Sequence, residues 1–259
     1  MKHTPRKRFG QHFLHAPAVI ERIAGAINPR EEDTLVEIGP GEGALTAALL
    51  QRIRFLHAVE LDRDLVPRLQ QRFGGALKIH QADALRFDFS TLANERGLRV
   101  VGNLPYNIST PLIFHLLSTP ARILDMTFLL QLEVVQRLAA SPGNKTYGRL
   151  SVMAQYHCRV EALFQVSPGS FRPPPKVHSA LVRLTPSNPI PWPANDEAVF
   201  ANLVNQAFAQ RRKTLGRALA GRIPPPAFEI AGIDPRRRAE TLSVAEFVKL
   251  SNAFALACE

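Results

Sequence analysis

The segment VEIGPGEG, at residues 36–43 of this 259-residue chain, has the pattern of a strand that runs through a glycine-rich turn into a helix. The apolar run TLVEI at 34–38 leads into glycines at 39, 41 and 43, and a helix is predicted to begin near Ala44. Because glycine has no side chain, a turn of this kind between strand and helix lets the backbone approach a bound nucleotide closely. Gly39, Gly41 and Ala44 also satisfy the pattern G-x-G-x-x-G/A, so the stretch alone fits a dinucleotide site, another nucleotide cofactor or a plain tight turn.

Further short runs of β-branched or apolar residues follow, with helix-like segments between several of them. Together with the first they lie at residues 34–38, 57–61, 77–80, 98–102 and 125–130. This alternation predicts an α/β fold with a parallel sheet wound on both faces by helices. Two later runs, 160–166 and 179–185, are joined by a proline-rich stretch, so we expect them to pair antiparallel at one edge of the sheet. A helix opened by Pro17 is expected to cap the sheet with its apolar face.

The sequence pattern of the last quarter of the chain differs from that of the preceding residues. Prolines at 189, 191 and 193 form a linker, and helical patterns follow. Asp196 is predicted to cap a helix with one apolar stripe, and Ser243 with Glu246 forms a capping box ahead of another. We therefore predict a catalytic domain over residues 1–188 and a small all-helical domain over residues 189–259.

The charge balance favours a polyanionic partner. The chain has 32 Lys and Arg against 22 Asp and Glu, a formal net charge of +10, although a solvated basic surface would explain the same numbers. Cys158 and Cys258 lie far apart with no neighbours spaced as metal ligands, so we expect no disulfide, no metal site and a reducing cytoplasmic environment. No apolar run approaches the roughly 20 residues of a membrane span.

Two acidic residues lie at the ends of the second and third predicted strands. Glu60 lies about 20 residues after the glycines, where a carboxylate can accept hydrogen bonds from both ribose hydroxyls. This fits NAD and S-adenosylmethionine equally well. Asp83 lies just past the third strand, where it can accept from an adenine amino group. Three strands that each end in a suitable residue favour a nucleotide cofactor over solvated loop charges.

The motif Asn-Leu-Pro-Tyr at residues 103–106 follows the fourth predicted strand, at the edge where open α/β sheets bind ligands. The nitrogen lone pair of an adenine N6 amine is delocalised into the ring, which makes it a poor nucleophile. The side-chain oxygen of Asn103 and a backbone carbonyl at Leu104 or Pro105 can accept hydrogen bonds from the amine. These bonds would make the nitrogen more nucleophilic. Tyr106 would stack on the base. Alone the motif fits a simple turn; after a cofactor pattern it predicts amine methylation.

With these motifs the chain resembles the small-subunit ribosomal RNA adenine dimethyltransferases over nearly its whole length. The shared segments are RKRFGQ at 6–11, VEIGPGEG at 36–43, ELD at 60–62, NLPYNIST at 103–110, YGRLSV at 147–152, PPPKV at 173–177 and QRRKT at 210–214. The resemblance implies a Rossmann-like S-adenosylmethionine-dependent methyltransferase sheet with a small helical C-terminal domain. It also implies dimethylation of the N6 amines of two adjacent adenines, in a hairpin loop near the 3′ end of small-subunit ribosomal RNA.

The resemblance further implies the roles of particular residues. Cofactor contacts are expected at His12, Leu14, Gly39, Glu60, Asp83 and Asn103. The family usually has Asn at position 12, so with His12 the tautomer and charge of an imidazole bear on that contact. Phe171 is expected to pack on the face of the target base opposite Tyr106.

Three basic clusters are candidates for RNA contact. They are Arg6, Lys7 and Arg8; Arg211, Arg212 and Lys213; and Arg236, Arg237 and Arg238. Such runs are commonly solvated faces, but together they are suited to bind phosphates. The expected partner is the RNA of the immature small ribosomal subunit, bound by a monomer.

Three other functions remain open on these residues. One is a related methyltransferase of large-subunit RNA, as in macrolide resistance. Another is an assembly factor that binds the immature subunit without needing its methylation. The third is a nicotinamide-dependent dehydrogenase, which rests on the glycine pattern alone.

Overall fold

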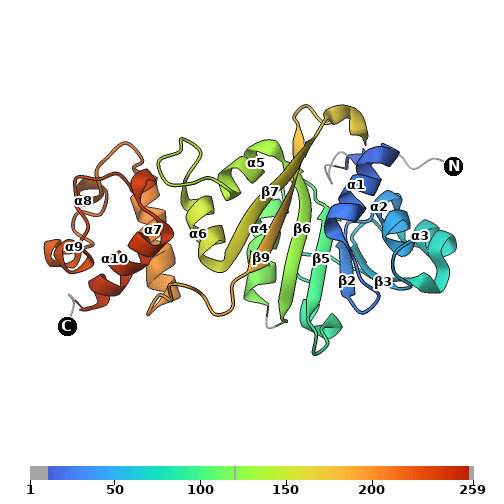
Figure 1. Ribbon diagram of the computed structural model, residues 1–259, viewed down its shortest axis with the longest axis horizontal. Helices are drawn as coiled ribbons and strands as arrows, with labels where there is room; N and C mark the ends of the chain where they lie inside the picture. Colours follow the sequence, from blue (N-terminus) through green and yellow to red (C-terminus); the bar gives the residue numbers. More distant parts are fainter. Residues whose placement is uncertain (1–10, 120, 257–259) are drawn as a thin grey trace. The chain divides into compact units, whose positions relative to one another are not determined.

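The computed structural model describes residues 11–119 and 121–256 (Figure 1). Contacts divide the chain into two units, one of residues 1–135 with 161–186 and the other of residues 136–160 with 187–259. The first unit contains the mostly parallel sheet and the second contains most of the C-terminal helices. The first has the Rossmann-like arrangement that the alternating pattern predicts.

The sheet of the first unit has seven strands within the described residues, in the order β4-β3-β2-β5-β6-β9-β7. Strands β2 to β6 pair in parallel, and β9 pairs antiparallel to β6. β9 and β7 are hydrogen-bonded neighbours at the edge, as predicted. Their bounds are β2 (Thr34–Ile38), β3 (Leu56–Glu60), β4 (Leu77–Gln81), β5 (Leu98–Asn103), β6 (Ile123–Gln131), β7 (Cys158–Val166) and β9 (Ser179–Pro186).

Helices precede, connect and follow the parallel strands. They are α1 (Pro17–Ile27), α2 (Ala44–Leu50), α3 (Val66–Phe73), α4 (Ser109–Ser118) and α5 (Leu132–Leu138), with short 3-10 turns at Gly74–Ala76, Phe89–Leu92 and Pro168–Ser170. Pro17 opens α1 as predicted, and Ile23, Ala24 and Ile27 are its buried residues. They join the apolar core that includes Leu35 of β2 and Leu49 of α2, so α1 packs its apolar face on the sheet unit.

The strand order places a crevice where the winding reverses. β2 is the first strand of the parallel set and lies between β3 and β5, and ligands of open α/β sheets bind at the carboxyl ends of strands at such a point. A small second sheet adds to this edge, because β1 (Phe13–Leu14) pairs antiparallel with β8 (Phe171–Arg172). The sequence patterns gave no indication of this pairing.

The second unit is built around its own apolar core. Its helices are α6 (Arg149–His157), α7 (Glu197–Ala209), α8 (Leu215–Ala218), α9 (Pro225–Ala231) and α10 (Val244–Leu256), with a 3-10 turn at Ala239–Thr241. The caps are as predicted: Asp196 accepts from the amides of Ala198 and Val199, and Ser243 and Glu246 bond reciprocally.

The division between the units differs from the predicted sequential boundary at 188/189, because residues 136–160 group with the C-terminal helices. Packing is the physical reason. Tyr147, Val152 and Tyr156 are buried in the same cluster as Phe200 and Phe247. The rings of Tyr156 and Phe200 lie 4.5 Å apart between centroids. A contact-defined domain therefore takes in α6 although α6 precedes β7 in the chain.

Candidate functional site

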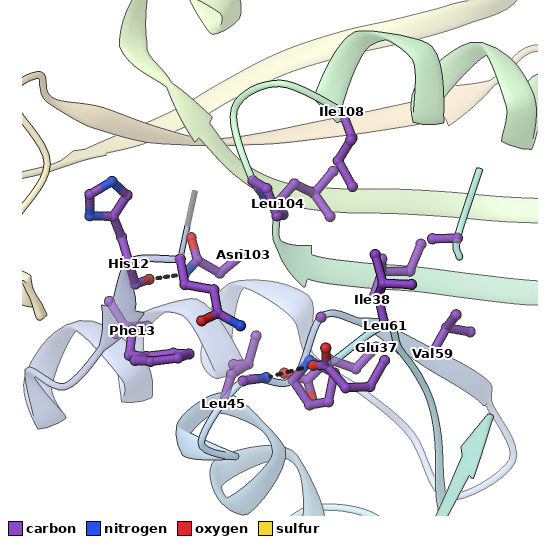
Figure 2. Close-up of a pocket in the computed structure, with 18 of the residues that line it drawn as sticks. His12, Phe13, Glu37, Ile38, Leu45, Val59, Leu61, Asn103, Leu104 and Ile108 are labelled. Atoms are coloured by element: carbon purple, nitrogen blue, oxygen red, sulfur yellow. Dashed lines mark hydrogen bonds between the residues drawn. The ribbon is translucent and has the colours of Figure 1, made fainter. Parts of the chain in front are cut away.

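A cavity of about 210 Å³ lies at the carboxyl ends of β2, β3 and β5 (Figure 2). It brings together most of the predicted site residues, namely His12, Leu14, Gly39, Glu60, Asp83, Asn103, Leu104, Pro105 and Tyr106. Figure 2 shows Asn103 facing the backbone of His12, with Glu37 and Val59 in another part of the cavity. Five segments remote in sequence thus share one cavity.

The glycine-rich turn presents bare backbone to the cavity. Gly39 has φ +66°, and a Cβ built on it would meet no atom within 4 Å, so open space borders the chain here. Glu60 supports the turn, since one carboxylate oxygen accepts from the amide of Gly41 at 3.3 Å and the other from the amide of Asp62 at 2.8 Å. Burial raises the pKa of Glu60 above its ordinary value. This arrangement has room for a nucleoside against the turn, with an acidic side chain beside it.

Glu37 lines the same cavity and was not among the predicted site residues. Its side chain is 1% exposed and accepts a hydrogen bond from the hydroxyl of Thr46 at 2.6 Å. Burial raises the pKa of Glu37 to about 7, against the opposing effect of the Thr46 bond. A charged residue inside the buried strand TLVEI was the available sequence signal, because an acid in such a place is costly unless it has a function or a partner.

The N-terminal segment, residues 11–14, forms another side of the cavity. This segment fixes the side chain of the catalytic candidate Asn103. The side-chain nitrogen of Asn103 donates to the backbone oxygen of His12 at 2.8 Å. Since the amide nitrogen is used in this way, the side-chain oxygen remains as the acceptor. The segment is fixed in turn by Gln11, whose side chain donates to Asp62 at 3.1 Å, and by the pairing of β1 with β8.

The imidazole of His12 lies between two other parts of the site. Its Nδ1 donates to the carbonyl of Pro173 at 2.7 Å, because a carbonyl can only accept. Its ring stacks on Tyr106 with centroids 5.7 Å apart and an angle of 28°. The hydroxyl of Tyr106 is held by Ser179 at 3.0 Å. The side chain at position 12 therefore contacts the predicted base-stacking residue.

Phe171 is the predicted site residue that the cavity does not include. Its side chain is 2% exposed and packs in the core that contains Leu14. In this conformation Phe171 supports the N-terminal segment through the β1–β8 pair, and its stacking on a base stays a prediction. Asp83 does line the cavity, and one of its carboxylate oxygens accepts from the amide of Leu85 at 3.0 Å. Nearby Leu61, which is 51% exposed, offers an apolar surface that the sequence patterns did not single out.

The predicted RNA-binding residues differ in their surroundings in the structure. Arg6, Lys7 and Arg8 lie outside the described residues. Arg212 and Lys213 are exposed in the second unit, whereas the guanidinium of Arg211 bonds to acceptors of the protein itself. In the third cluster, Arg236 pairs with Asp234 and Arg237 with Glu246, and Arg238 is exposed.

The described residues offer neither a group suited to a metal ion nor a membrane-spanning helix. They contain no group of three or more side chains placed to hold a metal ion. Across the same ranges, no helix has the length and apolar character needed to cross a membrane.

Comparison with known proteins bears on what this cavity serves. The family model described as ribosomal RNA adenine dimethylase matches residues 2–256. The chain belongs to this family. A relative named ribosomal RNA small subunit methyltransferase A, from Marinobacter nauticus, is 55% identical over 98% of this chain and 92% of its own length. The protein of the same name from Laribacter hongkongensis is 54% identical over 97% and 96%.

Solved structures agree with the family. A dimethyladenosine transferase from Plasmodium falciparum has a TM-score of 0.81 and 25% identity, covering 92% of this chain and 96% of that one. The 23S rRNA methyltransferase ErmE has a TM-score of 0.72 and 25% identity, covering 94% and 99%. These similarities to methyltransferases confirm the predicted fold class.

Proposed function

We propose that this protein dimethylates the N6 amines of two adjacent adenines in a hairpin loop near the 3′ end of small-subunit ribosomal RNA. Its partner in this proposal is the RNA of the immature small subunit, in the cytoplasm, and no metal is needed. The orientation of Asn103 carries the proposal, because the bond to the His12 carbonyl leaves the side-chain oxygen to accept from an amine. The names of the relatives that share more than half of their residues with this chain support the choice of RNA.

The cavity fits S-adenosylmethionine as the cofactor. Gly39 offers backbone without a side chain, Glu60 offers a carboxylate at the end of β3, and Asp83 offers another beyond β4. Leu61 adds an apolar surface on which a flat ring could lie. When bound, S-adenosylmethionine supplies an electrophilic methyl group on a positively charged sulfur, which is already a good leaving group.

The acceptors of the protein make the target amine nucleophilic. An adenine N6 whose hydrogens are bonded to the Asn103 oxygen and to the carbonyl of Leu104 or Pro105 is drawn toward a pyramidal geometry, which localises its lone pair. These bonds strengthen as positive charge develops on the nitrogen, so they stabilise the transition state more than the ground state. Because the His12 carbonyl fixes the amide beforehand, little reorganisation is needed when the reaction occurs.

Tyr106 positions the base. Its ring lines the cavity three residues after Asn103, and the bond from its hydroxyl to Ser179 fixes the ring plane. Stacking of this kind contributes about 1–3 kcal/mol per base. An adenine in a folded RNA must leave its stack to reach Asn103, and the aromatic surface replaces the stacking that is lost.

The proposal is tested by incubating the protein with labelled S-adenosylmethionine and undermethylated small subunits, followed by mapping of the modified nucleotides. Dimethyladenosine at two adjacent positions is expected. Asn103→Ala should lower kcat by about 10²–10³-fold, the loss typical for one preorganised hydrogen-bonding group, while its thermal unfolding shows an intact fold. The proposal fails if the well-folded wild type leaves the RNA unmodified, or if Asn103→Ala methylates at the wild-type rate. Methylation of large-subunit RNA instead would assign the activity to the related class that includes ErmE.

A further inference from the structure

The side chain of His12 makes its contacts on the side of the cavity where the target base is expected. Its Nδ1 donates to the carbonyl of Pro173, and its ring lies against Tyr106. Figure 2 shows the imidazole directed away from the part of the cavity where Glu37 and Val59 lie. That part adjoins the glycine-rich turn, because the carbonyl of Val59 accepts from the amide of Gly39 at 2.9 Å. The imidazole therefore faces the target site and not the turn assigned to the cofactor.

The bond from the imidazole continues the β1–β8 pair by one position. Phe13 lies opposite Arg172 in this antiparallel pair, so the same register places His12 opposite Pro173. At 2.7 Å between Nδ1 and the carbonyl oxygen, the bond is at the short end of the usual range for an N–H donor. It ties the N-terminal segment to residues 171–173, the segment from which Phe171 is expected to reach the base.

The contact with Tyr106 covers only part of the phenol ring. Stacked rings touch at about 3.5–4 Å between their planes, whereas the two centroids here are 5.7 Å apart at an angle of 28°. The imidazole is therefore displaced sideways over one edge of Tyr106, and the rest of that face is left for a base. Since Ser179 binds the hydroxyl at the far end, the ring of Tyr106 is held at two separate points.

The backbone of His12 is held without help from its side chain. Gln11, the preceding residue, donates to Asp62 at 3.1 Å, and β1 begins directly after His12. The bond from Asn103 goes to the backbone oxygen of His12, so it does not use the imidazole. A variant without the imidazole is therefore expected to keep the orientation of the Asn103 amide, and the effect of the ring can be measured separately.

We propose that the imidazole of His12 positions the target base. It holds Tyr106 and residues 171–173 at a fixed separation and borders the part of the cavity into which the adenine ring enters beside Tyr106. The side chain then serves the target and contributes little to the affinity for the cofactor. This inference rests on the proposed function for the identity of the base as adenine.

Methylation kinetics and cofactor binding together test this role. His12→Ala should raise the KM for RNA about 3- to 10-fold, because one hydrogen bond and one ring contact that hold the base site are lost. Its kcat should stay within about twofold of wild type, since the acceptors of the amine are intact. The dissociation constant for S-adenosylhomocysteine, measured by calorimetry without RNA, should also stay within about twofold. His15→Ala, which removes an exposed imidazole from the same segment, is the matched control and should leave all three constants unchanged.

A double-mutant cycle shows whether the imidazole acts through Tyr106. In the Tyr106→Ala protein, His12→Ala should raise the KM for RNA by less than about twofold further. His12→Asn, which keeps a side-chain donor but has no ring, should raise this KM in the wild-type background and replaces His12→Ala if thermal unfolding shows that the alanine variant is not folded.

Three results would overturn the inference. They are a wild-type KM for His12→Ala, a KM that falls as if the imidazole blocked the base, and a loss of affinity for S-adenosylhomocysteine, which would assign the side chain to the cofactor. The two proposals fail differently. A wild type that leaves adenine unmethylated refutes the proposed function, whereas a wild type that methylates adenine and a His12→Ala protein with any of these three results refute only the role of His12.

Discussion

Replacing Glu37 with Gln should change how the stability of the protein depends on pH. Burial raises the pKa of Glu37 from 4.5 to about 7, and each pKa unit corresponds to about 1.4 kcal/mol. Below pH 4.5 the carboxyl is protonated in both the folded and the unfolded state, so its ionisation costs nothing. Between pH 4.5 and pH 7 only the unfolded state ionises this group, so about 3 kcal/mol of stability is lost across this range, and the loss is complete by pH 8.

Glu37→Gln keeps the shape of the side chain and an acceptor for the Thr46 hydroxyl, but it does not titrate. The melting temperature of the variant relative to wild type should therefore rise between pH 5 and pH 8.5, by roughly 6–12 °C for 3 kcal/mol. Glu60, whose pKa burial also raises, titrates in both proteins and largely cancels in the difference.

The assay is thermal unfolding by circular dichroism at a series of pH values. The exposed Glu32 provides a control, because Glu32→Gln should leave the pH profile unchanged. A difference between Glu37→Gln and wild type that stays constant from pH 5 to pH 8.5 would refute the reasoning. A constant difference would mean that ionisation of the Glu37 carboxyl does not lower the stability of the folded state between pH 5 and pH 8.5.

Three further outcomes are expected. Gly43→Ala should lower the free energy of unfolding by about 2 kcal/mol in urea titrations, because Gly43 has φ +79° and a Cβ would lie 2.6 Å from Phe73; Gly25→Ala in the open part of α1 should not. Arg99→Ala should cost about 3–5 kcal/mol in the same assay, since it leaves two largely buried carboxylates unpaired, and a loss below 1 kcal/mol would contradict this. Tyr106→Ala should raise the KM for RNA roughly 5- to 150-fold in methylation kinetics while Tyr106→Phe stays near wild type, and equal effects would argue against stacking.

The strands were predictable because each carries a local signal. The run at 34–38 matches β2 in full, and the others differ from the observed strands by one or two residues at their ends. The cavity was predictable for the same reason: Gly39, Glu60, Asp83 and Asn103 each lie at or just past the end of a strand, and parallel strands bring their carboxyl ends to one edge.

What could not be predicted depends on contacts between distant segments. The bond between Asn103 and the His12 carbonyl joins residues 91 positions apart, and no local pattern encodes it. Phe171 reads as a loop aromatic until the β1–β8 pair buries it. The partners of Arg211 are equally hidden, because two of its acceptors are backbone oxygens, which every residue has, and the third is the carboxylate of Glu240, 29 positions away.

The β1–β8 pairing also orders events during synthesis. His12 emerges from the ribosome early, but its partner carbonyl at Pro173 is 161 positions later, and the Phe13–Leu14 strand has no partner until residues 171 and 172 are made. At a synthesis rate of about 5–20 residues per second, roughly 10–30 seconds pass between the synthesis of the N-terminal segment and that of its partner strand β8. The wall that orients Asn103 is therefore completed only after most of the sheet already exists. In a nascent chain the glycine-rich turn would therefore be present before the side-chain amide of Asn103 is fixed by the His12 carbonyl.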